Sequence, residues 1–213
     1  MDHRMVSLAD QVFEQLETEV LSGAYQVDEL LTESRLSEKM QVSRTPIHDA
    51  LHRLEQEHLV RLSSKGAVVV GISRQDLASI YEVRMRLEGL AARKAAAHRN
   101  ESALADMQHT LELQGFYTDR GDPDGIHSMD DHFHEVLYRN CGDRVLENVL
   151  MPLHRKLLKY RRASLSGKPR AENALDEHRA IYEAIRDGDE DRAERLTLQH
   201  VANARDHILA EVD

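Results

Sequence analysis

The chain has 213 residues, a formal net charge of −10, and only 4% aromatic residues with no tryptophan. This length allows one or two domains, and the low aromatic content favours a helical protein over a β-sandwich. No apolar run is long enough to span a membrane and no apolar signal core opens the sequence, so we expect a cytoplasmic protein without a membrane partner. The acidic net charge argues at first sight against nucleic-acid binding. Residues 34–66, however, contain six basic and four acidic residues, which makes this segment locally positive.

The first third of the chain predicts short helices followed by a β-hairpin. Helices are expected at residues 7–22, 33–40 and 45–57, with Ser7 as the capping residue of the first and Thr45 as that of the third. Two β-prone runs, 59–62 and 67–70, flank a short loop that ends at Gly66, and they form the one sheet that we expect.

Everything after Ser73 has helical periodicity. The expected helices are 74–98, 101–118, 124–140, 143–163, 171–187 and 190–211. The fold class is therefore mainly α, with an N-terminal domain at residues 1–72 and an all-helical bundle at residues 73–213. The boundary is expected near Gly71–Arg74.

Three short helices followed by a hairpin form a winged helix-turn-helix, an arrangement that inserts its third helix into the DNA major groove. One face of that helix carries Arg44, His48 and His52 at intervals of four residues. Arg44 can reach base edges, Thr45 can bind phosphate, and Lys65 at the hairpin tip can approach the neighbouring DNA backbone. A coincidental pattern, or a winged helix that binds protein, is the alternative.

The segment LLTESRLSEKMQVSRTPIHDALHRLEQEHLV resembles the DNA-binding motif of the GntR family of bacterial transcription factors. That resemblance implies that DNA is contacted by five positions, Arg35, Arg44, Thr45, His48 and the wing glycine Gly66. The family usually has arginine where this chain has His48. A neutral histidine cannot make the bidentate contact to guanine that arginine makes, so the DNA sequence that is read can differ.

The helical part contains a second group of candidate residues. Asp130 and His134 lie one turn apart on one helix, and His178 and His200 lie in apolar stripes of two later helices. One carboxylate and three imidazoles in a common interior suit a divalent metal ion such as Zn, Ni or Mn. Arg84 lies on the apolar stripe of its own helix and requires an anion, which is either Glu88 or the carboxylate of a ligand.

The segments YEVRMRLEGLAARKAA, DDHFHEVLYRNCGD and EHRAIYEAIRDGDEDRAERLTLQHV look like the FCD domain of the FadR subfamily of GntR regulators. In metal-containing members an Asp-x-x-x-His pair and two later histidines hold a divalent ion. These positions correspond to Asp130, His134, His178 and His200, and the effector-binding arginine corresponds to Arg84. Asn203, about one turn after His200, is a further candidate for contact with the effector.

The main hypothesis is a homodimeric transcriptional regulator, a repressor rather than an enzyme, that binds a pseudo-palindromic operator in double-stranded DNA. Its effector would be a small carboxylic or sugar acid held at the metal ion. A metal-dependent enzyme with an appended DNA-binding domain is one alternative, because a site of three histidines and one aspartate can activate water. A metal-ion sensor is another, although Arg84 would then have no obvious role.

Overall fold

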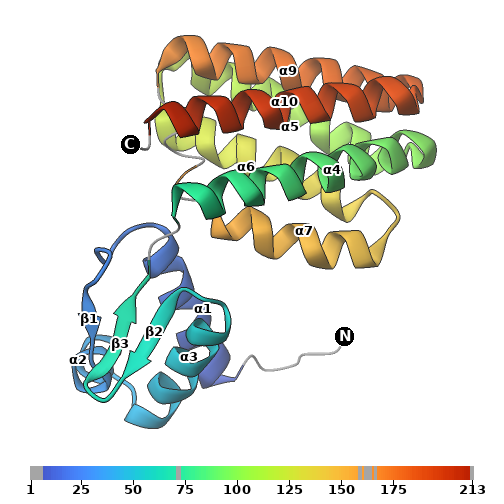
Figure 1. Cartoon of the computed structure of the whole chain (residues 1–213). Coiled ribbons are helices and arrows are strands. Elements are labelled where there is room, and N and C mark those ends of the chain that lie inside the picture. The colour runs from blue at the N-terminus through green and yellow to red at the C-terminus, as the bar shows by residue number, and fades with distance from the viewer. Residues whose placement is uncertain (1–6, 71–72, 158–159, 161–164, 166, 212–213) are drawn as a thin grey trace. The chain divides into compact units, whose positions relative to one another are not determined.

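The computed structural model describes residues 7–70, 73–157, 160, 165 and 167–211, with side chains up to residue 210. The chain divides into two compact units, Met1–Ser73 and Arg74–Asp213, each of which is considered by itself. The mainly helical fold class predicted from the sequence is confirmed (Figure 1). Within the described residues, no helix combines the length and the apolar character needed to cross a membrane.

The first unit combines short helices with a small sheet. Its elements are α1 (Leu8–Leu21), β1 (Leu30–Leu31), α2 (Glu33–Met40), α3 (Arg44–Gln56), β2 (Val60–Ser63) and β3 (Gly66–Val69). The predicted hairpin is present as β2 and β3, but the expectation of a two-stranded sheet is wrong. Leu30 and Leu31 pair antiparallel with β3, so the strand order is β1-β3-β2.

Side-chain caps fix where the first two helices begin. The Ser7 hydroxyl accepts a hydrogen bond from the Asp10 amide at the start of α1, as expected, and Thr32 accepts one from the Arg35 amide at the start of α2. The predicted cap of the third helix is wrong. Ser43 occupies the cap position without a side-chain bond, and α3 starts at Arg44, which places Thr45 inside the first turn.

An apolar core holds α3 in place within the first unit. Leu36 of α2 and Ile47 and Leu54 of α3 are fully buried, together with Leu16 of α1 and Leu31 of β1. Because this face of α3 packs in the core, the opposite face with Arg44 and His48 is exposed.

The second unit is a bundle of helices. They are α4 (Arg74–His98), α5 (Glu101–Arg120), α6 (Pro123–Arg139), α7 (Arg144–Lys156), α9 (Lys168–Asp187) and α10 (Glu190–Glu211). The helix expected at 143–163 is shorter, since α7 ends at Lys156, and residues 158–159 and 161–164 of that prediction lie outside the described residues. The other boundaries agree with the expected ones to within three residues.

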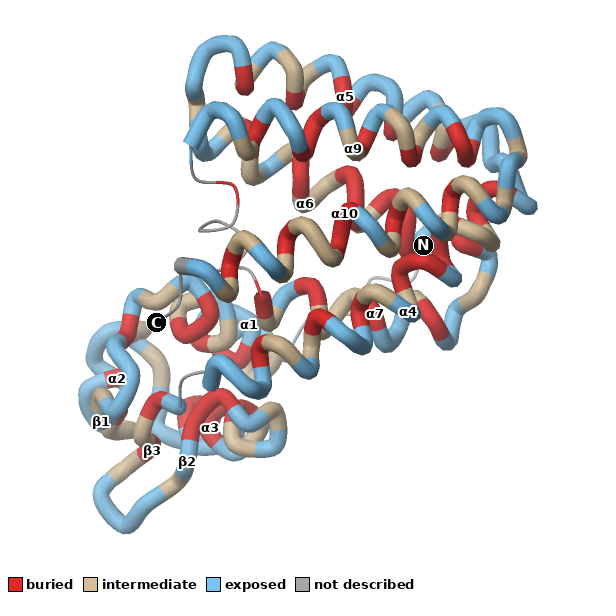
Figure 2. Tube along the Cα trace, turned by 45° about the horizontal axis from the view of Figure 1, so that its top comes forward, coloured by how far each residue is buried: buried red, intermediate tan, exposed pale blue. Residues whose placement is uncertain are grey.

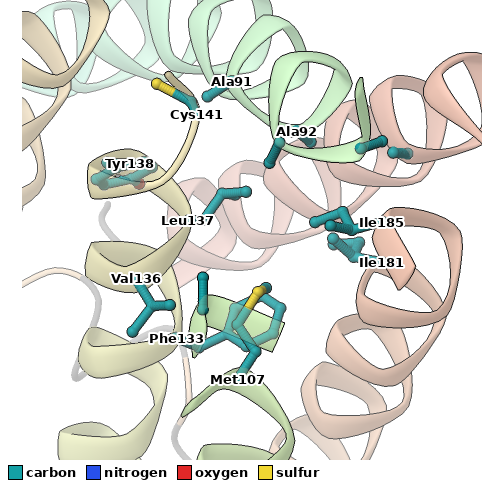
Figure 3. Packing of buried hydrophobic residues seen from close by; sticks show 14 of the residues in the cluster. Ala91, Ala92, Met107, Phe133, Val136, Leu137, Tyr138, Cys141, Ile181 and Ile185 are labelled. Atoms are coloured by element: carbon teal, nitrogen blue, oxygen red, sulfur yellow. The ribbon is translucent and has the colours of Figure 1, made fainter. Parts of the chain in front are cut away.

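The bundle packs through the inward faces of its helices, where the buried positions in Figure 2 gather. α10 packs along α4, and α5 packs against both α6 and α9. Figure 3 shows Phe133 and Leu137 of α6 among side chains of the neighbouring helices, including Met107 and Ile181. Small alanines of α4, such as Ala92, allow the helices to approach closely.

Candidate functional site

A groove in the first unit brings together several of the predicted DNA-binding residues. It lies between α3, the start of α2 and the β2–β3 turn, and its lining includes Arg44, His48, Lys65 and Gly66. Arg44 and Lys65 are exposed, and among the described residues neither side-chain cation forms an ion pair or hydrogen bond. Two cations without a protein partner on one concave face suit a polyanion.

The remaining predicted DNA-binding residues are placed differently. Thr45 is exposed in the first turn of α3. Arg35 lies on α2, where its guanidinium donates to Glu29 at 2.8 Å, so it would have to exchange this surface ion pair for a phosphate. His48 donates through Nδ1 to the carboxylate of Glu33 at 2.8 Å, a contact that the sequence did not predict.

Glycine is required at position 66 by the backbone of the wing. Its φ is +140°, and an added Cβ would collide with the carbonyl group of Leu31 in β1. Gly66 therefore allows β1 to lie directly beside β3, and its carbonyl accepts a hydrogen bond from the Ser63 hydroxyl at 2.8 Å across the turn. This glycine shapes the wing that carries Lys65.

The bundle brings His134 of α6, His178 of α9 and His200 of α10 into one buried cluster. One nitrogen atom of each ring lies within 4.8 Å of those of the other two. The two Nε2 atoms of His134 and His200 are 3.2 Å apart. Ligand atoms at about 2.1 Å from a common zinc ion lie roughly 3.0–3.4 Å apart, so this pair has the separation of two metal ligands. Asp130 lies beside the cluster, with Oδ1 3.6 Å from Nε2 of His178.

Each histidine has an acceptor at its other nitrogen. Nδ1 of His200 donates to Glu177 at 2.7 Å, Nδ1 of His178 donates to the amide oxygen of Gln114 at 3.0 Å, and Nδ1 of His134 lies 3.3 Å from Glu88. When Nδ1 carries the proton, Nε2 of the neutral ring has a lone pair for a metal ion. Three inward lone pairs repel one another, and a divalent cation removes that repulsion, so the residues present fit a metal ion.

A buried ion pair supports one of these acceptors. Nε of Arg84 donates to Oε1 of Glu88 at 2.5 Å, and both side chains are almost completely buried. Burial alone would raise the pKa of Glu88, but the charge of Arg84 and the N–H donor of His134 outweigh it and hold the pKa well below its usual range. Glu88 therefore stays ionised between the guanidinium and the imidazole.

Glu177, the carboxylate that accepts a hydrogen bond from His200, lies in an environment comparable to that of Glu88. Burial raises its pKa, whereas hydrogen bonds from His200 and Asn203 and the charge of Arg170 lower it, with a net decrease. Asn203 donates to Oε1 of Glu177 at 2.8 Å, so it touches a partner of His200 and is not among the residues lining the cavity. The structure thus places Asn203 beside Glu177, the carboxylate that contacts His200.

A small cavity of about 10 Å³, the space of a single water molecule, borders the histidines. Its lining includes Asp130, His134 and His200 together with two arginines, Arg84 and Arg170. Nη1 of Arg84 and Nε of Arg170 are buried without a hydrogen-bond partner among the described residues. Arg170 was not predicted as a site residue, because nothing in the sequence around it shows that the start of α9 faces this cavity.

Residues 79–203 match the FCD domain, and residues 8–70 match the family described as bacterial regulatory proteins of the gntR family. The chain belongs to the GntR family. The resemblance stated from the sequence is therefore confirmed, and this GntR protein is a transcriptional regulator with a DNA-binding winged helix and an FCD domain.

Known GntR regulators resemble this chain over most of its length. It is 29% identical to the gluconate operon transcriptional repressor of Bacillus licheniformis, over 93% of this chain and 82% of that protein. It is 25% identical to the transcriptional repressor RspR of Escherichia coli, over 84% of this chain and 78% of that one. Among solved structures, E. coli McbR/YncC superposes with a TM-score of 0.84 at 20% identity and covers 98% of this chain and 100% of its own.

Proposed function

We propose that this GntR regulator is a cytoplasmic homodimer that represses transcription from a pseudo-palindromic DNA operator. A small carboxylic or sugar acid, held at a divalent metal ion in the bundle, would change its affinity for that operator. In this account residues 1–72 bind DNA, and residues 73–213 bind the metal ion and the acid and form the dimer. The observation that carries the proposal is the cluster of three convergent imidazoles, two of which line a cavity together with the guanidinium groups of Arg84 and Arg170.

The ligands of the metal ion would be His134, His178, His200 and Asp130. A set of three imidazoles and one carboxylate suits Zn, Ni or Mn. When bound, the ion supplies a Lewis-acid centre that accepts a carboxylate oxygen from the effector. Glu88, Gln114 and Glu177 then orient the histidines as acceptors that face their Nδ1–H groups.

The charges around the cavity favour an anionic effector once the metal ion is present. Three carboxylates, Asp130, Glu88 and Glu177, face two guanidinium groups, Arg84 and Arg170, and leave a net charge of −1 with neutral histidines. A divalent ion changes this net charge to +1. A monoanionic acid neutralises the remaining charge, and the buried Nη1 of Arg84 can donate to it.

Two arginines at the cavity also favour a regulator of this kind over the two alternatives. A sensor whose signal is the metal ion alone would leave Nη1 of Arg84 and Nε of Arg170 without a hydrogen-bond acceptor, whereas the carboxylate of an acid can accept from them. An enzyme is not favoured either, because the family and its named relatives are transcriptional regulators. We propose repression because both of the named relatives are repressors.

The proposed dimer interface is an apolar surface on two helices of the bundle that pack against each other. Val83 and Leu90 of α4 and Val145 and Val149 of α7 are exposed, and Val145 has a relative exposure of 74%. A second copy of the chain, related by a two-fold axis, would cover these side chains and place two winged helices on one operator.

The DNA-binding part of this proposal is tested by replacing Arg44 with alanine. Because its guanidinium has no protein partner among the described residues, the Arg44→Ala variant should melt like the wild type but lose specific operator binding in fluorescence anisotropy. Arg139→Ala is the matched control, since it removes one cation that only forms a surface pair with Glu135 on α6. Unchanged operator affinity in Arg44→Ala would refute the proposed DNA contact.

A further inference from the structure

One contact on the exposed face of α3 has a chemical consequence beyond the general proposal of DNA binding. Nδ1 of His48 lies 2.8 Å from Oε1 of Glu33, the first residue of α2. The side chain of His48 is 54% exposed and lines the groove between α3 and the wing. The pair therefore stands on the surface that carries Arg44 and Lys65.

The carboxylate determines which nitrogen of His48 carries the proton. An ionised carboxylate can only accept hydrogen bonds, so Nδ1 must be the donor in this contact. In the neutral ring Nε2 is then an acceptor, and it lies on the side of the ring away from Glu33. Without Glu33, the two tautomers of an exposed imidazole would both be available.

Neighbouring side chains restrict the orientation of this ring. His52, one turn further along α3, packs its ring edge-on against that of His48 with a centroid separation of 4.4 Å. Leu51 and Arg44 line the same groove. His48 is thus held from two sides, by Glu33 at Nδ1 and by His52 at the ring, while Arg44 contributes donors beside it.

We propose that the Glu33–His48 pair determines the base read at one operator position, through a hydrogen bond that Nε2 of His48 accepts from the exocyclic amine of adenine or cytosine. In the major groove only these two bases present an amine donor, whereas guanine and thymine present acceptors. The negative charge of Glu33 beside the ring further disfavours the acceptor atoms of guanine. This inference rests on the proposed DNA binding, with His48 as the reading residue and Glu33 as a positioning residue.

The test is selection of binding sites by the full-length protein from a random duplex DNA library at about pH 8. Wild type is compared with His48→Ala, His48→Arg and Glu33→Gln, with His109→Ala as a control on an exposed histidine of α5. Melting curves establish that each variant is folded, which is expected because His48 is exposed and Glu33 only partly buried.

The expected result is a wild-type motif in which one base pair per half-site depends on His48 and on the exocyclic amine of its adenine or cytosine. At that position His48→Ala should lose a preference of about fivefold, and His48→Arg should select guanine. Glu33→Gln should weaken the preference there and leave the other positions unchanged, because a glutamine amide can face Nδ1 with either its oxygen or its nitrogen. His109→Ala should reproduce the wild-type motif.

Other outcomes separate the two levels of the argument. If His48→Ala leaves every position of the motif unchanged, the inference about His48 is refuted while DNA binding stands. The same holds if a selected duplex whose amine at that position is removed, with purine in place of adenine or 2-pyrimidinone in place of cytosine, binds the wild type as tightly as the natural duplex. If Glu33→Gln retains the full preference, the positioning role of Glu33 is refuted. If the wild type enriches no motif at all, the proposed operator binding fails, and this inference fails with it.

Discussion

At the scale of single residues, pairs of side chains that come from different helices carry the proposed chemistry. Glu177 adjoins His178 in the sequence but accepts a hydrogen bond from His200 on the next helix. Gln114 of α5 accepts the hydrogen bond from His178. The sequence indicated the three histidines and Asp130 by helical spacing. It could not indicate their acceptors, because polar residues on an inward face are recognised only when the facing helix is known.

Removing two of the histidines should remove the metal ion. The His134→Ala, His178→Ala double variant loses two of the three convergent imidazoles, so metal-loaded protein should lose its bound ion on dialysis, as measured by elemental mass spectrometry. His132→Ala is the control, since His132 lies on the same helix but donates to Asp106 on its outer side. Retention of one ion per chain by the double variant would disprove this ligand set.

Glu19 in the winged helix provides a pH-dependent contribution to stability. Tyr25 and Lys39 donate to its carboxylate at 2.6 and 2.8 Å. Partial burial raises the pKa of Glu19, but these two hydrogen bonds outweigh it and the net pKa lies below the ordinary value of 4.5. A lowered pKa in the folded state stabilises above the unfolded value, and this contribution is lost as the pH falls through the folded pKa.

Glu19→Gln should therefore reduce the free energy of unfolding at neutral pH by about 1–2 kcal/mol, measured by urea denaturation followed by circular dichroism. The difference from wild type should shrink as the pH falls below 4.5. Glu14→Gln, an exposed position on the same helix, should have little effect at any pH. A deficit for Glu19→Gln that stays constant down to acidic pH would contradict this explanation.

At the scale of elements, a helix or strand could be predicted from the sequence only where residues near its ends mark its boundaries. The helices were found because capping residues such as Ser7, and breaks such as Gly188 with φ +73°, lie within a few residues of each helix end. Strand β1 was missed since it has only two residues, and its pairing with Ala67 and Val68 is set by chain folding across more than thirty positions. Helix α3 was placed one residue late because Pro46 is compatible with several positions in a first turn.

The wing provides a test at this scale. Gly66→Ala places a Cβ against the backbone of Leu31 at φ +140°, so it should separate β1 from β3 and destabilise the winged helix by about 1–3 kcal/mol. Gly121→Ala is the control, because Gly121 also has a positive φ but nothing within 4 Å of an added Cβ. Equal loss of stability in the two variants, measured by urea denaturation, would show that the contact with Leu31 is unimportant.

At the scale of the whole molecule, one chain contains a DNA-binding unit and an effector-binding unit. The net charge of −10 does not oppose DNA binding, since affinity depends on the cations near the phosphates, such as Arg44 and Lys65, and not on the total. Regulation requires that the acid bind one arrangement of the dimer better than another. The free energy of coupling is the same whether it is measured on the acid or on the DNA.

The most direct test of the central claim is the operator affinity of the metal-loaded, full-length protein, measured by fluorescence anisotropy with and without an acid. The acid is the one, from a panel of small carboxylic and sugar acids that includes gluconate, that raises the melting temperature most. We predict that it changes operator affinity by roughly 5–150-fold, that the operator changes the affinity for the acid by the same factor, and that the double histidine variant shows neither effect. An acid that binds the bundle with equal affinity in the presence and absence of operator would contradict the account.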